Sequence, residues 1–151
     1  MFRRSLLLCT AAIPAALALS ACTQTPSVSS VTSDVSLITT AIANVLPNVP
    51  NAPAALATYL SEIKSLASSI SSNASLPSAT TMQQFVSDVQ AFANIAAPLI
   101  PSASLYLTAI NDALALLPGL LAAVGVASGT PTANAIPPDQ ARAALHAFVG
   151  H

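Results

Sequence analysis

Charged side chains are scarce in this sequence of 151 residues, of which only four are Lys or Arg and five are Asp or Glu. Two of the four basic residues, Arg3 and Arg4, stand at the extreme N-terminus. Nucleic-acid binding requires a surface of Lys and Arg that neutralises phosphates, and this chain cannot build one. The composition therefore excludes a nucleic-acid partner.

The shortage of charge does not indicate disorder, because hydrophobic residues make up 54% of the chain. Disordered chains combine low hydrophobicity with high net charge. We therefore expect one compact domain, covering residues 28–151, with a core of its own. Its surface must be formed mainly by Ser, Thr, Asn, Gln and Ala.

Cysteine is also scarce, and both cysteines, Cys9 and Cys22, lie close to the N-terminus. Arg3 and Arg4 precede an apolar segment that begins at Leu6, and small residues follow the segment just before Cys22. This is the layout of a secretory signal. The apolar segment is shorter than the roughly 20 residues that a membrane-spanning helix needs.

The four residues that close this segment, Leu19-Ser20-Ala21-Cys22, resemble the lipobox of bacterial lipoproteins. The resemblance implies cleavage between Ala21 and Cys22, removal of residues 1–21, and a diacylglyceryl group on the Cys22 thiol. Residues 22–27 then form a tether, and no thiol is left for a disulfide. Thr23 after the cysteine implies, by the same resemblance, an outer membrane and a periplasmic face. An ordinary signal peptide with an A-x-A-like cleavage site is the alternative.

The rest of the chain has helical periodicity in four long segments, at residues 28–46, 53–72, 80–97 and 102–127. In each segment apolar residues recur every three or four positions, and prolines separate the segments. A shorter helix over 138–149 begins at a Pro-Pro-Asp sequence. No alternating strand pattern competes with this periodicity. The sequence predicts an all-α, up-and-down bundle of about four amphipathic helices plus a short C-terminal helix.

The periodicity also predicts which residues form the core and where some helices begin and end. Thr80 and Gln83 have the spacing of a capping box, which predicts a helix start there. Gly129 and Pro131 predict the end of the fourth helix. The expected core residues are, in chain order, Val28, Val31, Val35, Ile38, Ile42 and Val45; Leu56, Tyr59, Ile63, Leu66 and Ile70, with Leu60 and Ala67 widening this stripe; Met82, Phe85, Val86, Val89, Phe92, Ala93 and Ala96; Leu107, Ile110, Leu114, Leu117, Leu121 and Val124; Ala141, Leu145 and Phe148.

The segment 105–127 has two interpretations, because it is long enough to cross a bilayer and contains no basic residue. Asn111, Asp112 and Pro118 interrupt it. An Asp at membrane depth costs about 2.5 to 3.5 kcal/mol on insertion scales. A central bundle helix is the preferred interpretation, and insertion into the bilayer is the alternative.

One short motif resembles a catalytic site. Ser61-Glu62-Ile63-Lys64 matches the S-x-x-K pattern of penicillin-binding proteins and serine β-lactamases. The K-T-G motif of those enzymes is missing, and neither Ser33-Asp34-Val35 nor Ser87-Asp88-Val89 has the Asn of their S-D-N motif. We interpret Glu62 and Lys64 as solvated flanks of a helix and do not expect an enzyme.

The remaining titratable residues predict no metal or cofactor site. Asp34, Asp88 and Asp112 fall on three different predicted helices and are interpreted as solvated flanks. His146 and His151 lack the i, i+4 spacing of a helical metal pair. Hydrolysis by paired carboxylates would require raised pKa values and a cleft, which the sequence does not indicate.

The sequence thus favours a lipid-anchored envelope protein with a structural or binding role. It would attach to a membrane through Cys22 and present a weakly charged helical surface to an envelope protein, a lipid or an apolar ligand. The alternative is a membrane-active protein whose segment 105–127 inserts into the bilayer. A hydrolase that uses Ser61 and Lys64 is a distant third.

Overall fold

The computed structural model of the protein describes residues 27–126 and 136–150, and every regular element in these ranges is a helix. The predicted signal peptide, its cleavage site, Cys22 and His151 lie outside the described residues. In chain order the elements are α2 (Val28–Val45), the 3₁₀ turn η1 (Leu46–Asn48), α3 (Ala54–Ser72), α4 (Ala79–Ala96), the 3₁₀ turn η2 (Ala97–Leu99), α5 (Leu105–Ala123) and α6 (Pro138–Val149).

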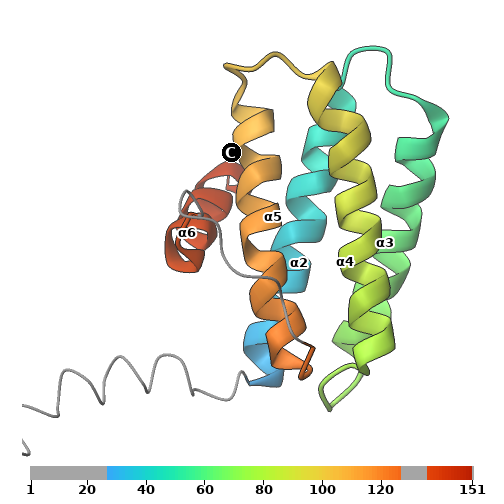
Figure 1. The fold of residues 1–151 in the computed structure, drawn as a ribbon, viewed down its shortest axis with the longest axis vertical. Coiled ribbons are helices and arrows are strands. Elements are labelled where there is room, and N and C mark those ends of the chain that lie inside the picture. Colours follow the sequence, from blue (N-terminus) through green and yellow to red (C-terminus); the bar gives the residue numbers. More distant parts are fainter. Residues whose placement is uncertain (1–26, 127–135, 151) are drawn as a thin grey trace, which may run out of the picture.

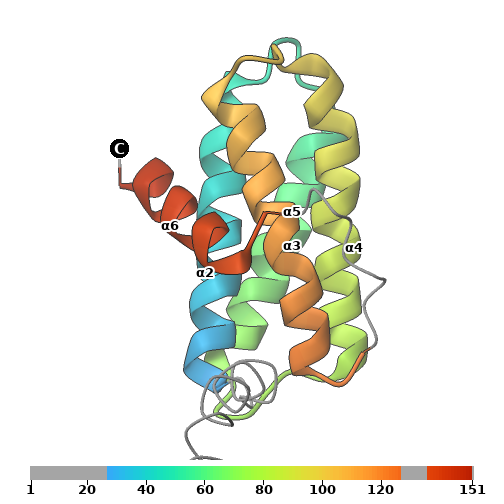
Figure 2. The same cartoon turned by 60° about the vertical axis from the view of Figure 1, so that its left-hand side comes forward.

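Helices α2 to α5 run alternately up and down, and the short helix α6 lies against one side of this group (Figure 1). Each long helix packs against its neighbours in the chain, and α5 also packs against α2, which closes the bundle. Helix α6 contacts α2 and α5 (Figure 2). The predicted all-α bundle with a short C-terminal helix is therefore confirmed.

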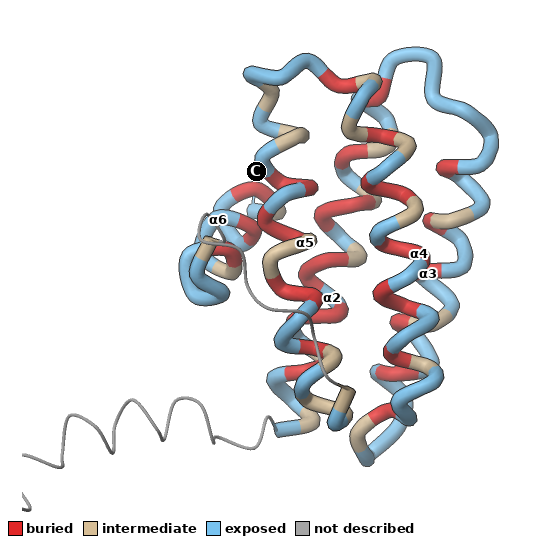
Figure 3. The backbone as a smooth tube through the Cα atoms, viewed as in Figure 1, coloured by how far each residue is buried: buried red, intermediate tan, exposed pale blue. Residues whose placement is uncertain are grey.

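The buried residues face the interior of the bundle on every helix and form one hydrophobic cluster (Figure 3). On α4 and α6 the buried apolar residues are the ones that the periodicity predicts. On α2 the buried face is wider than the predicted stripe, since it also includes Asp34, Leu37 and Ala41. Helix α2 packs against three helices, α3, α5 and α6. A narrow stripe of apolar residues cannot contact all three, so the buried face of α2 is wider.

The predicted core stripe of α5 is only partly correct: Ile110 and Leu117 are buried as predicted, but the inner face is rotated from the predicted one. Leu107, Leu114 and Leu121 are only partly buried, whereas Ala109, Ala113, Leu116 and Leu120 are fully buried. Leucines cover most of the circumference of α5, so the spacing of leucines alone does not define its inner face. The small side chains of Ala109 and Ala113 suit a face that packs closely on other helices.

Proline ends both of the helices that lead to the upper loops in Figure 1. Helix α2 continues into η1 with Pro47 and α4 into η2 with Pro98, each near the start of the 3₁₀ turn. Because proline has no N–H group, it cannot continue the helical hydrogen bonds, and the chain tightens into a 3₁₀ turn. The α-helices therefore end one residue before the predicted limits, at Val45 and Ala96.

The start of α4 differs from the predicted capping box. The N-cap residue is Ser78, whose Oγ accepts a hydrogen bond of 3.2 Å from the Thr81 N–H. The Ser78 and Thr81 hydroxyl groups also lie 2.8 Å apart. Thr80, the predicted cap, is the second residue of the helix and is exposed. The backbone of Ser78 is extended, with φ −65° and ψ 155°, which is the usual conformation of an N-cap residue.

The end of α5 also differs from the prediction, which placed it at residue 127. The helix begins at Leu105 and ends at Ala123, and Gly125 follows with a φ of 78°. The Val126 N–H donates to the Leu121 carbonyl at 2.9 Å, and the Gly125 N–H donates to the Ala122 carbonyl at 3.1 Å. These two bonds form a Schellman motif, in which glycine adopts the left-handed conformation at little cost. Gly129, the predicted stop, lies outside the described residues.

Candidate functional site

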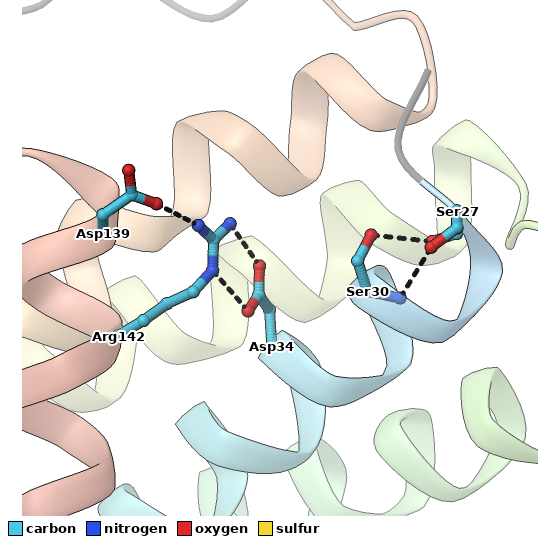
Figure 4. A network of polar contacts seen from close by, with 5 residues as sticks. All are labelled: Ser27, Ser30, Asp34, Asp139 and Arg142. Atoms are coloured by element: carbon cyan, nitrogen blue, oxygen red, sulfur yellow. Dashed lines mark hydrogen bonds and ion pairs between the residues drawn. The ribbon is translucent and has the colours of Figure 1, made fainter. Parts of the chain in front are cut away.

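An ion pair joins the first and last helices of the described structure (Figure 4). The Nε and Nη2 atoms of Arg142 in α6 donate to the two carboxylate oxygens of Asp34 in α2, both at 2.8 Å. Nη1 of the same guanidinium donates to Oδ1 of Asp139 at 3.0 Å. The pair is bidentate, which is the strongest geometry available to Arg and a carboxylate.

The environment of this pair differs between its two members. The side chain of Asp34 is only 11% exposed, whereas that of Arg142 is 39% exposed and that of Asp139 is 97% exposed. The hydrogen bond from Arg142 to Asp34, and the charges of Asp34 and Asp139, raise the pKa of the guanidinium against the opposing effect of burial. The guanidinium therefore stays charged, and the pair orients α6 on α2 rather than transferring protons.

Asp112 is a buried carboxylate of a different kind. It lies on α5 with 4% of its surface exposed, and no hydrogen bond to its side chain occurs within the described ranges. Burial raises the pKa of this carboxyl group, because the charged form loses hydration. A carboxylate of this kind is costly for the folded protein at neutral pH.

Asp88, on α4, is the third buried carboxylate. Its Oδ1 accepts a hydrogen bond of 2.9 Å from Nε2 of Gln84, one turn earlier on the same helix. Its Oδ2 is buried and has no partner among the described residues. A buried acceptor without a donor costs about 1 to 3 kcal/mol. Asp88 is thus only partly satisfied.

The interpretation of Asp34, Asp88 and Asp112 as solvated flanks is wrong, because all three are buried. Each lies three residues after one core residue and four before another, as Asp88 does between Phe85 and Phe92. This position beside the core stripe becomes buried when neighbouring helices cover the stripe closely. The pattern does not identify such sites by itself. Glu62 has the same spacing to Tyr59 and Leu66, two predicted core residues that are only partly buried, and Glu62 is exposed.

The buried carboxylates do not gather into a metal site. In the described part of the chain, no three His, Cys, Asp or Glu side chains are placed so that they could hold a metal ion. Asp34 is paired with Arg142, and no neighbouring charge contributes to the raised pKa of Asp112. The three groups therefore act separately.

The S-x-x-K residues lie on the outside of the bundle. Ser61, Glu62 and Lys64 are all exposed on α3. A nucleophilic serine usually lies beside a base in a pocket that excludes water, and an exposed helix surface does not provide this environment. His146 is likewise exposed, in the last turn of α6.

Helix α5 is long and apolar enough to cross a membrane by length and composition. In the folded chain its buried residues belong to the common core, and it packs against α2, α4 and α6. Leu105 is the one large hydrophobic residue that is strongly exposed in the described ranges, at 59%. The other large hydrophobic residues of α5 are buried or, like Leu107, Leu114 and Leu121, partly buried.

The charged residues of the described chain lie between the two ends of the bundle. We call the lower end in Figure 1 the Ser27 end; it comprises residues 27–33, 68–81 and 119–126. The upper end, called the Leu105 end, comprises residues 42–58 and 92–107. Neither end contains Asp, Glu, Lys or Arg. Both ends present hydroxyl, amide and small apolar groups, and the Leu105 end also presents the strongly exposed side chain of Leu105.

The chain matches no protein-family model, no curated protein and no solved structure.

Proposed function

We propose that the protein is a lipid-anchored protein of the bacterial envelope that acts by binding a partner through its weakly charged helical surface. One observation carries the proposal: α2, which comes first among the described helices, has its N-cap at Ser27, only five positions after Cys22. A lipid on Cys22 would hold the bundle directly at a membrane surface. The lipobox Leu19-Ser20-Ala21-Cys22 supplies the attachment chemistry.

The character of the described surface supports a lipid anchor. With Leu105 as its single strongly exposed large hydrophobic residue, the bundle offers little apolar surface for a bilayer. Acyl chains contribute roughly 0.8 kcal/mol per buried CH₂, and two or more chains give stable attachment where one does not. The lipid on Cys22 would therefore supply the membrane affinity, leaving the protein surface for an envelope protein or an apolar ligand. By resemblance, the membrane is the outer membrane and the bundle faces the periplasm.

The test compares wild-type protein with two cysteine variants expressed with the signal. Cys22→Ser should lose the acyl mass on the N-terminal peptide and move from the membrane to the soluble fraction. Cys9→Ser is the matched control, since residue 9 would be removed with the signal, and it should behave as wild type. The proposal fails if wild-type protein carries no acyl group, or if Cys22→Ser fractionates as wild type does.

A second candidate function is membrane activity through α5, which is favoured by the length and apolar character of this helix. In that case α5 would leave the bundle and insert, exposing the buried carboxylate of Asp112 to the bilayer. The test uses the chain from residue 22 with Cys22→Ser, produced without the signal. Under the first candidate function this protein should be helical and monodisperse and should release no dye from liposomes. Dye release would support the second candidate over the first.

A further inference from the structure

We propose that the Ser27 end of the bundle rests against the lipid headgroups of the membrane that holds the anchor, and that the Leu105 end points away from it. The inference rests on the proposed function, because it requires a lipid on Cys22. It goes further by assigning the lipid surface as the partner of one particular end of the bundle. The opposite end is then left for a protein partner.

The length of the tether restricts the orientation. Five residues from Cys22 to Ser27 reach at most about 18 Å when fully extended. Helix α2, with 18 residues, is about 27 Å long. The tether is therefore shorter than the bundle, and an inverted arrangement with the Leu105 end on the membrane is excluded by covalent geometry. The remaining choices are a bundle that stands on its Ser27 end and one that lies on its side.

The composition of the Ser27 end favours the standing arrangement. Most exposed residues of this end are small or uncharged polar residues, and they include Ser29, Ser30, Ser71, Ser72, Asn73, Ala74, Ser75, Ser78, Ala79 and Thr80. Hydroxyl and amide groups can donate to the phosphate and ester oxygens of lipids. No charge has to be desolvated when this end approaches the headgroups. The contact should therefore depend little on salt or on the charge of the lipid.

Two sides of the bundle are less suited to this contact. One side carries the exposed charges of Glu62 and Lys64 on α3. The opposite side carries α6, which projects from the four long helices and exposes Asp139 and His146 (Figures 1 and 2). A bundle lying on either of these two sides would place a carboxylate near the lipid phosphates. The side formed by α4 exposes no charged residue. A bundle lying on that side would bring its two ends equally close to the membrane, so labels at the two ends test for it.

The orientation can be measured by fluorescence quenching in vesicles. A lipid on Cys22 leaves the processed chain without a free thiol, so one introduced cysteine can be labelled selectively. Three exposed serines serve as label sites: Ser75 at the Ser27 end, Ser65 on the side of α3 and Ser102 at the Leu105 end. Each full-length, lipidated Ser→Cys variant is labelled and reconstituted into phosphatidylcholine vesicles that contain a lipid with a nitroxide on its headgroup.

The label at Ser75→Cys should lose several-fold more fluorescence than the label at Ser102→Cys, and Ser65→Cys should lie between them. Equal quenching at residues 75 and 102 indicates a bundle lying on its side and overturns the inference. Strongest quenching at residue 102 overturns it as well. Failure of the proposed function has a different signature, because unmodified Cys22 would itself be labelled and the protein would not float with the vesicles.

Discussion

Arg142 of α6 donates two hydrogen bonds of 2.8 Å to the carboxylate of Asp34 in α2, a residue 108 positions earlier in the chain. Asp34 is nearly buried, while Arg142 is partly exposed. Helix α6 is thus attached to α2 by a directed polar contact, in addition to the packing of Leu145 and Phe148. This contact allows the role of α6 in stability to be tested with single substitutions.

Arg142→Met should lower the free energy of unfolding by about 1 to 3 kcal/mol, because it leaves the Asp34 carboxylate without its donor. The loss should fall at the lower end of this range, since the Arg142 side chain is 39% exposed and water can partly replace it. Asp139→Asn is the matched control and should cost less than about 0.5 kcal/mol, because Asp139 is fully solvated. Urea unfolding followed by circular dichroism measures both.

A double variant separates the ion pair from the packing of Arg142. Replacing a buried ion pair by apolar residues is often neutral, whereas removing one member is not. Asp34→Leu combined with Arg142→Met should therefore recover most of the stability that Arg142→Met loses. If the double variant is less stable than Arg142→Met alone, the cost of the single substitution does not come from an unpaired Asp34.

Asp112→Asn should stabilise the protein at neutral pH. Burial raises the pKa of the Asp112 carboxyl group in the folded state, so the folded protein binds this proton more tightly than the unfolded chain does. Wild-type stability therefore decreases as pH rises through the ordinary range of Asp and up to the raised pKa. The stability advantage of Asp112→Asn over wild type should appear over this interval. It should vanish at about pH 3, where Asp112 of the wild type is protonated in both the folded and the unfolded state. Thermal unfolding at a series of pH values gives the profile, and an advantage that persists at low pH would contradict it.

Two glycines near the end of α5 should respond in opposite directions to alanine. A side chain at either position would meet no atom within 4 Å, so the difference comes from the backbone alone. Gly119→Ala should stabilise by about 0.4 to 1 kcal/mol, because alanine favours the helix interior. Gly125→Ala should destabilise by about 1 kcal/mol, because its φ of 78° is unfavourable for alanine. The melting temperatures of both variants are measured. If they shift in the same direction, α5 does not end in a Schellman motif at Gly125.

The start of α4 can be tested in the same paired manner. Ser78→Ala removes the side-chain acceptor of the Thr81 N–H and should cost about 1 kcal/mol. Thr80→Ala changes an exposed residue inside the first turn and should stay within about 0.5 kcal/mol of wild type. Chemical denaturation distinguishes them. A larger loss for Thr80→Ala would favour the capping box predicted from the sequence.

The periodicity of apolar residues predicts much of this fold because an amphipathic helix must bury one face. It identifies all buried apolar residues of α4 and α6, because large apolar and polar residues are clearly separated on these two helices. It is less successful for α5, where apolar residues surround the helix and the inner face is chosen by close packing on Ala109 and Ala113. Helix ends are least predictable, since competing signals such as Ser78 and Thr80, or Gly125 and Gly129, lie only a few residues apart.

The polar groups of the core could not be predicted from the sequence, because their burial depends on which helices meet. Asp34 is covered where α6 packs on α2, and the ion pair joins residues 108 positions apart. A usable signal was the width of the apolar face of α2, since Leu37 and Ala41 lie outside the predicted stripe. Extra apolar positions of this kind indicate an additional helix, and Asp34, one turn before Leu37, lies on the same face of α2.

The alternating directions of α2 to α5 have a consequence for the electric field of the molecule. Each end of the bundle contains two helix N-termini and two helix C-termini. The partial charges at these termini, roughly plus and minus half an elementary charge, largely cancel when they alternate around one end. None of the four helices has an acidic residue in its first turn or a basic residue in its last turn. With their helix dipoles opposed, the four helices need no such charges, and both ends of the bundle remain close to electrically neutral.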